Sequence, residues 1–171
     1  INNNAGLWGY NIGDTVRFVS LNPYRIVVTG RTSHYISAFG EHVIAEEVEH
    51  SLMTAAEAAG VRIVEFTVAP RVEATEGTGP HHEWYIEFEQ PPRDMAGFAA
   101  RGDKNLQARN IYSKELLHGH ILETLHILPV RKNGFIDYMK SLGKLGGQNK
   151  VPRLSNNRMI AEGLAPYLEK P

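Results

Sequence analysis

The stretch EHVIAEEVEHSLMTAAEAAGVRIVEFTV, residues 41–68, contains the change of pattern that decides the fold class. Its first part has a helical period, because apolar side chains recur on one face of a helix up to Ala59. Gly60 is a residue that commonly ends a helix. From Arg62 the period becomes two, which is typical of a half-buried strand. We therefore expect a helix over residues 41–59, followed directly by a strand over residues 62–69 that ends at Pro70.

The next segment, HEWYIEFE at residues 82–89, gives the clearest strand in the chain. Trp84, Ile86 and Phe88 alternate with polar or amphipathic side chains, so the three apolar residues are expected in the core. This alternation predicts one buried face and one solvated face, as in an antiparallel sheet.

The rest of the chain extends the same mixture of elements. Strands are expected at residues 14–20 and 24–29, joined as a hairpin through the turn signal at Asn22 and Pro23, and again at 124–130. Helices are expected at 94–118, 134–142 and 156–168, while residues 1–9 and 71–80 are predicted to be loops. Because the elements show no regular strand–helix–strand period, the predicted class is α+β, with a mostly antiparallel sheet flanked by helices.

Composition excludes several classes of function. The chain has 171 residues, enough for one domain, and 18 Lys and Arg against 19 Asp and Glu, which argues against nucleic-acid binding. It has no cysteine, so a disulfide scaffold and a thiol nucleophile are excluded. No apolar run approaches the roughly 20 residues of a membrane span, and no signal peptide is evident at the start. We therefore expect no membrane partner and a cytoplasmic location.

Three stretches contain residues suited to binding or catalysis. In YNIGD, residues 10–14, Asp14 could accept hydrogen bonds from two vicinal hydroxyls, or could simply cap its own turn. Arg31 follows the second expected strand, and its planar guanidinium could donate hydrogen bonds to phosphate or sugar oxygens. Alternatively, Arg31 pairs with one of the many glutamates. Lys150 lies in the glycine-rich stretch 143–150, where it could steady developing negative charge or belong to a solvated basic loop.

Other polar clusters have simpler explanations. His118, His120 and His126 lie close in sequence, but residues two apart on a helix do not face each other, so no metal site is predicted. The acidic residues Glu46, Glu47 and Glu49 are interpreted as a solvated helix face.

Four ordered strings, read together with YNIGD and Arg31, resemble one family. They are AGLWGY at 5–10, GRTSHYISAFGEHVIAEEVE at 30–49, HEWYIEF at 82–88 and GGQNKVPR at 146–153. The chain is similar over essentially its whole length to the auxin-responsive (Gretchen Hagen type) acyl-acid amido synthetases, with a bacterial character, within the adenylate-forming superfamily that includes acyl-CoA synthetases.

The resemblance implies an activity and an arrangement of domains. Members activate a carboxylic acid with ATP and Mg²⁺ to an acyl-adenylate, then transfer the acyl group to an amine or amino acid. Because members are several hundred residues long and this chain begins with Ile1, we expect a C-terminal fragment that folds but does not catalyse alone. Residues 1–20 would end the large N-terminal domain and form the connecting strand. Residues 21–171 would form the mobile C-terminal domain, which packs on the N-terminal domain and leaves most of the ATP and Mg²⁺ site there.

The resemblance also implies roles for individual residues. Asp14 would bind the ribose hydroxyls, Arg31 the ribose or a neighbouring phosphate, and Tyr10 would shape the nucleotide pocket. Lys150 stands where these enzymes carry a mobile catalytic lysine. Ser33 stands where related enzymes have an Asp or Lys hinge residue, so the position of the hinge is left open.

Two other functions are compatible with the sequence. A small α+β domain with an exposed sheet edge could be a non-catalytic module that binds a partner protein. The wider superfamily also includes enzymes that form CoA thioesters, although the four strings favour the amide-forming family. The sequence does not identify the acid or the amine.

Overall fold

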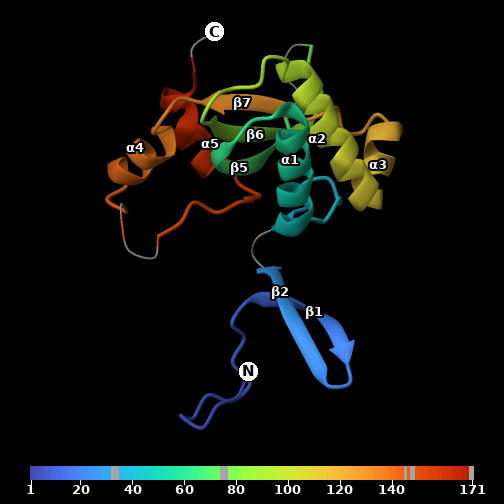
Figure 1. Cartoon of the computed structure of the whole chain (residues 1–171), viewed down its shortest axis with the longest axis vertical. Helices are drawn as coiled ribbons and strands as arrows, with labels where there is room; N and C mark the ends of the chain where they lie inside the picture. Colours follow the sequence, from blue (N-terminus) through green and yellow to red (C-terminus); the bar gives the residue numbers. More distant parts are fainter. Residues whose placement is uncertain (32–34, 74–76, 145, 147–148, 170–171) are drawn as a thin grey trace.

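The computed structural model describes the whole chain except residues 32–34, 74–76, 145, 147–148 and 170–171 (Figure 1). The described elements, in chain order, are β1 (Asp14–Leu21), β2 (Tyr24–Arg31), β3 (Tyr35–Ile36), β4 (Val43–Ile44), α1 (Ala45–Ala59), β5 (Ile63–Arg71), β6 (His81–Phe88), α2 (Met95–Arg109), α3 (Ile111–His118), β7 (His126–Val130), α4 (Gly134–Ser141), α5 (Met159–Leu164) and the 3₁₀ turn η1 (Ala165–Tyr167). The predicted α+β class is confirmed.

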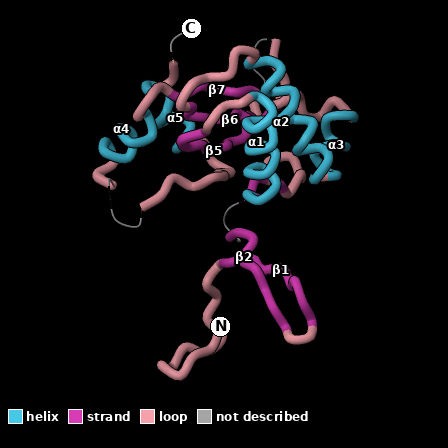
Figure 2. Tube along the Cα trace, in the orientation of Figure 1, coloured by secondary structure: helices cyan, strands magenta, loops and turns pink. Residues whose placement is uncertain are grey.

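A three-stranded sheet in the order β5-β6-β7 forms the centre of the domain (Figure 2). β6 pairs antiparallel with β5 and parallel with β7. Helices α1 and α2 supply one hydrophobic core, in which Leu52 and Phe98 pack with Trp84 and Ile86 of β6. Helices α4 and α5 supply a second core around Tyr85, so the sheet is covered on both faces.

Strand β6 corrects the prediction of one solvated face. All eight of its residues are buried, including the polar Glu83 and Glu87. The carboxylate of Glu87 accepts hydrogen bonds from the backbone N–H groups of Asn133 (2.7 Å) and Phe135 (3.3 Å), at the start of α4. The alternation was read correctly for Trp84, but the other face is buried too, because its carboxylates are satisfied by the elements that cover it.

Pro70 also differs from its prediction, because it lies inside β5 and pairs with His82. On the outer edge of β5, Val68 donates its N–H to Arg153 and accepts a hydrogen bond from Ser155. Residues two apart in a strand direct their backbone groups the same way, so the missing N–H of Pro70 removes no bond to β6. An edge strand therefore tolerates this proline.

Helix α1 begins at Ala45 rather than at residue 41, because residues 43–44 form a short strand paired with β3. The Glu47 carboxylate accepts a hydrogen bond from the Ile44 N–H (3.1 Å) and holds the first turn. Glu47 is half-buried, which corrects its interpretation as part of a solvated face.

Two other predicted helices are shorter than expected. The span 94–118 divides at Asn110 into α2 and α3, and the Asn110 side chain accepts a hydrogen bond from the Ser113 N–H (2.8 Å) as the cap of α3. The span 156–168 contains α5 and then η1, where Pro166 lies in the first turn. None of the described helices is long and apolar enough to cross a membrane.

The predicted hairpin is confirmed as β1 and β2, which pair antiparallel next to the N-terminal end of α1 (Figure 1). Arg17 of β1 contacts Glu46 of α1 at 3.4 Å. Several large apolar side chains of the hairpin are exposed, among them Phe18 and Tyr24, whose rings meet edge to face. The hairpin therefore carries apolar surface that the described residues leave uncovered.

Candidate functional site

Asp14 and Arg31 lie at the two open ends of the hairpin. Asp14 is the first residue of β1, Arg31 is the last of β2, and their Cα atoms are partners in the strand register. The next pair in the register is Thr15 and Gly30, and the Thr15 hydroxyl lies 3.1 Å from that of Thr29. The antiparallel pairing thus places two residues that are 17 positions apart in sequence at one end of a single ladder.

Tyr10 lies in the loop before β1, near these residues in sequence. Its ring is exposed, and its backbone N–H donates a hydrogen bond to the carbonyl of Ile1 (3.0 Å). Gly13, between Tyr10 and the strand, has φ of 76°, a conformation that glycine adopts without the steric penalty of a side chain. The loop therefore turns into β1 immediately before Asp14.

Lys150 lies on a different part of the molecule, in the segment between α4 and α5. Its side chain is exposed and lines a cavity of about 250 Å³, together with Glu65, Glu87 and Lys144. None of the residues that line this cavity belongs to the hairpin. The structure therefore brings Asp14 and Arg31 together and places Lys150 apart from them.

The chain is attached to the sheet immediately after Lys150. Val151 is buried, and the Pro152 carbonyl accepts a hydrogen bond from the Thr67 hydroxyl (2.7 Å). Arg153 forms an ion pair with Glu65, and its guanidinium lies 4.4 Å from the centre of the Phe66 ring. Burial lowers the pKa of Arg153.

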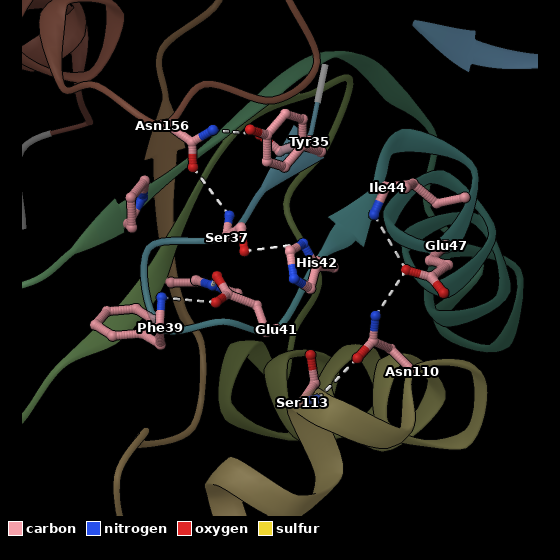
Figure 3. Close-up of polar contacts among 12 residues, drawn as sticks. Tyr35, Ser37, Phe39, Glu41, His42, Ile44, Glu47, Asn110, Ser113 and Asn156 are labelled. Atoms are coloured by element: carbon pink, nitrogen blue, oxygen red, sulfur yellow. Dashed lines mark hydrogen bonds and ion pairs between the residues drawn. The ribbon is translucent and has the colours of Figure 1, made fainter. Parts of the chain in front are cut away.

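The segment that follows the hairpin, residues 35–44, is held to the domain by side chains from several elements (Figure 3). Asn156 contacts the backbone of Tyr35 and Ser37. The Glu41 carboxylate accepts hydrogen bonds from the Phe39 N–H (2.8 Å) and from His82 Nε2 (2.9 Å). The contacts with Asn156 and with His82 tie this segment to the domain, whereas the contact between Phe39 and Glu41 lies within the segment.

A second attachment point uses Glu47, which accepts hydrogen bonds from Ile44 and from the Asn110 amide (3.0 Å). The same Asn110 side chain caps α3, as Figure 3 shows. One carboxylate and one amide therefore join β4, α1 and α3.

A charged network lies on the face of β6 that α5 covers. Glu83 is contacted by Arg158 (2.7 Å), by the Tyr85 hydroxyl (2.7 Å) and by Arg71 (3.0 Å). Burial by itself would raise the pKa of Glu83, but the hydrogen bonds from Tyr85 and Arg158 outweigh it and the pKa is lowered. Burial and the hydrogen bond to Glu83 raise the pKa of Tyr85. Both oxygens of the Glu83 carboxylate already have partners within the domain, so we regard the network as structural.

The sequence analysis missed the contributions of Glu41, His82 and Asn156. Glu41 was interpreted as the start of a helix, and Asn156 lies 119 positions from its partner Ser37. A signal for Glu41 was available, since it directly follows Gly40, which has φ of 88°. No local pattern indicates the partner of Asn156. Ser33, the candidate hinge residue, lies outside the described residues.

The described residues contain no group of three or more His, Asp or Glu side chains that could hold a metal ion. Of the site residues named from the sequence, the structure describes Tyr10, Asp14, Lys150 and the backbone of Arg31.

Comparison with solved structures defines the class of domain. The fold is similar to that of a GH3.15 acyl acid amido synthetase, with a TM-score of 0.76, 21% identity, and coverage of 96% of this chain and 32% of that one. It is also similar to an AtGH3.15 acyl acid amido synthetase in complex with 2,4-DB, with a TM-score of 0.75, 20% identity, and coverage of 96% and 31%. The chain has the fold of about one third of such a synthetase.

A family model settles the relationship more specifically. The model described as the GH3 family C-terminal domain matches residues 46–159, and the chain belongs to this family. The resemblance inferred from the four sequence strings is confirmed. No curated protein matches the chain.

Proposed function

We propose that the chain is the C-terminal part of an ATP-dependent ligase that adenylates a carboxylic acid and joins it to an amine or amino acid. The observation that carries this proposal is membership of the GH3 family over residues 46–159. The order of Asp14, Arg31 and Lys150 along the chain is also that of the amide-forming family named above.

The proposed reaction has two steps. In the first, a carboxylate oxygen of the acid attacks the α-phosphorus of ATP, and pyrophosphate leaves. In the second, the amine nitrogen attacks the acyl carbon, loses a proton, and AMP leaves. Negative charge builds up around the α-phosphate in the first step, and the ammonium group of Lys150 is suited to offset it.

The nucleotide-binding roles rest on the chemistry of the residues at the end of the hairpin. The carboxylate of Asp14 can accept hydrogen bonds from both ribose hydroxyls, and the guanidinium of Arg31 can donate to ribose or phosphate oxygens. Tyr10 would line the nucleotide pocket. We assign Mg²⁺ to the ATP phosphates and mainly to residues outside this chain.

The domain arrangement remains part of the proposal. The chain spans about a third of the length of the synthetase structures that it matches. The rest of the enzyme would supply the binding sites for the acid and the amine and most of the ATP site. The exposed apolar residues of β1 and β2 suit a surface that packs on an N-terminal domain. The division at residues 20 and 21 falls at the end of β1. We place the enzyme in the cytoplasm, and we expect the isolated chain to be inactive.

The same exposed hairpin supports a second candidate function, a non-catalytic module that binds another protein. The two functions make different demands on Asp14, Arg31 and Lys150. A synthetase needs all three at one nucleotide during the first step, whereas a binding module does not. A CoA-thioester ligase shares the first step and differs only in the acceptor.

The test is ATP binding by calorimetry to the complete protein that contains this chain, and to its Asp14→Ala variant. We expect binding that weakens strongly in the variant. The control is Glu57→Ala, which removes an exposed carboxylate from α1 and leaves ATP affinity unchanged. Equal ATP affinity in the Asp14 variant would refute the ribose role. An intact protein that does not bind ATP would favour the protein-binding module. If ATP binds, amine, amino acid and CoA acceptors supplied with candidate acids separate the two ligase reactions.

A further inference from the structure

The side chain of Asn156 joins two segments that lie far apart in sequence (Figure 3). Its Oδ1 accepts a hydrogen bond from the Ser37 N–H, and its Nδ2 donates one to the Tyr35 carbonyl, both at 2.9 Å. Only one orientation of the amide satisfies a donor and an acceptor placed in this way, so the assignment of the two atoms follows from the backbone. The asparagine therefore binds Tyr35 and Ser37 in the manner of a neighbouring strand.

On one side of this contact, Asn156 is connected to Lys150 by a short segment that is attached throughout to β5. The Pro152 carbonyl accepts a hydrogen bond from Thr67, and Val68 exchanges backbone hydrogen bonds with Arg153 (2.9 Å) and Ser155 (3.0 Å). Attachment at alternate positions leaves little freedom between residues 151 and 156. Asn156 and the start of this segment at Lys150 are therefore held in a fixed relation to β5.

On the other side, Tyr35 and Ser37 lie where the chain enters the domain from the hairpin. Tyr35 begins β3, whose only described strand partner is the two-residue strand β4. This strand pair forms few hydrogen bonds of its own, and Ile36 and Val43 hold it by packing in the core. The two hydrogen bonds from Asn156 add a polar attachment to a different part of the chain at this entry point.

We infer that Asn156 is a positioning residue that couples the segment entering from the hairpin to the segment that bears Lys150. Its catalytic consequence rests on the function proposed above, whereas the coupling itself does not. When the mobile domain turns, the hydrogen bonds of Asn156 keep the entry segment and the Lys150 segment together. Lys150 is then brought to the reacting phosphate in a fixed relation to the connection.

The first experiment measures amide hydrogen exchange in the complete protein, for the wild type, for Asn156→Ala and for Asn157→Ala. The Asn157 variant is a matched control, because this neighbouring side chain accepts a hydrogen bond from the Met159 N–H at the start of α5 instead of bonding to residues 35–37. We expect Asn156→Ala to increase exchange at Ser37 and also at Ser155, whose N–H is bound to Val68. An increase at Ser37 alone would mean a local hydrogen bond without coupling, and would overturn the inference.

The second experiment measures ATP–pyrophosphate exchange with an acid that the enzyme accepts. We expect Asn156→Ala to lower kcat about tenfold while KM for ATP changes less than twofold, because misplacement of a catalytic group costs rate more than binding. Asn156→Asp keeps the acceptor for Ser37 and should recover part of the rate, and Asn157→Ala should stay within twofold of wild type. Unchanged kcat in Asn156→Ala would refute the positioning role. If the wild-type protein shows no exchange with any acid, the proposed function fails, and the hydrogen-exchange result still decides the coupling.

Discussion

Glu41 Oε1 and His82 Nε2 lie 2.9 Å apart in the interior of the domain, where both side chains are almost completely buried. The pair connects the segment after the hairpin to the central strand β6. Burial by itself would raise the pKa of Glu41, but the hydrogen bond from His82, followed by contacts with backbone groups that include the Phe39 N–H, outweighs it and the pKa is lowered. The carboxylate is thus held in its charged form by the groups that surround it.

The first prediction concerns the stability that this pair contributes. Glu41→Ala removes the acceptor of the buried His82 ring and of the half-buried Phe39 N–H. We expect the free energy of unfolding to fall by about 3 to 5 kcal/mol, which is typical of breaking a buried pair from one side. Urea denaturation followed by circular dichroism measures this change.

Glu57→Ala is the control for this experiment, because Glu57 is an exposed carboxylate on α1. Its effect should stay within about 0.5 kcal/mol. If the two variants lose similar stability, the Glu41–His82 contact does not hold the segment to the domain.

The second prediction is a pH dependence that arises from Glu83. Its pKa is lowered in the folded chain from the usual 4.5, so the unfolded chain binds more protons in acid. The stabilisation by Glu83 is therefore fully present above about pH 4.5 and is lost as the pH falls through the folded pKa. Glu83→Gln should be less stable than wild type at pH 7, and the difference should narrow below about pH 4.5.

The measurement is urea unfolding between pH 7 and about pH 3, where acid protonates carboxylates that are paired in the native state. Glu89→Gln serves for comparison, since Glu89 pairs with Arg62 on the surface and such pairs contribute little. A stability difference for Glu83→Gln that stays constant over the whole range would contradict the prediction.

The local sequence pattern predicted where the helices and strands lie better than it predicted which of their side chains are buried. The alternation of residues 82–89 identified Trp84 as core, because a period of two places alternate residues on one face. It could not show that Glu83 is buried, because that depends on Arg158, 75 positions further along the chain. The break at Asn110 was missed for a related reason, since a single capping side chain ends one helix and begins another.

In the candidate site too, local sequence predicted some features, and contacts between distant segments could not be predicted. Motif order selected Asp14 and Arg31, and the hairpin that was predicted from the sequence brings them together, because paired strands bring their free ends together. The contacts of Asn156 could not be predicted, since they join segments 119 and 121 positions apart and leave no periodic signal. The roles of Tyr10, Asp14, Arg31 and Lys150 stay predictions.

The third prediction compares two glycines in helices. A Cβ atom at Gly102 of α2 would lie 3.8 Å from Leu125 and 3.9 Å from Trp84, which is ordinary van der Waals contact. Gly102→Ala should therefore stabilise the chain by about 0.5 to 1 kcal/mol, since alanine favours the helix interior. A Cβ atom at Gly163 of α5 would lie 2.5 Å from the buried Tyr138 ring, so Gly163→Ala should cost about 1 to 3 kcal/mol.

Differential scanning calorimetry distinguishes these two changes by their sign. We expect a melting temperature about 1 to 4 °C higher for Gly102→Ala and a lower one for Gly163→Ala. Because the substitution is the same, the change in backbone entropy of the unfolded chain cancels in the comparison. Two shifts of the same sign would mean that the packing around Tyr138 or Trp84 differs from that described.

The last prediction tests the catalytic assignment of Lys150 in the complete enzyme. Lys150→Ala should lower kcat for ATP–pyrophosphate exchange by roughly 100- to 1000-fold, the usual cost of losing an electrostatic donor at a reacting centre. Affinity for ATP should change little, because in the proposed site the nucleotide is held by Tyr10, Asp14 and Arg31 and by residues outside this chain. Lys144→Ala is the matched control, since Lys144 is also exposed and lines the same cavity as Lys150. Its kcat should stay within about threefold of wild type, a change of less than 1 kcal/mol in the barrier. Equal losses in the two variants would indicate a general effect of positive charge, and an active Lys150→Ala enzyme would remove Lys150 from the catalytic site.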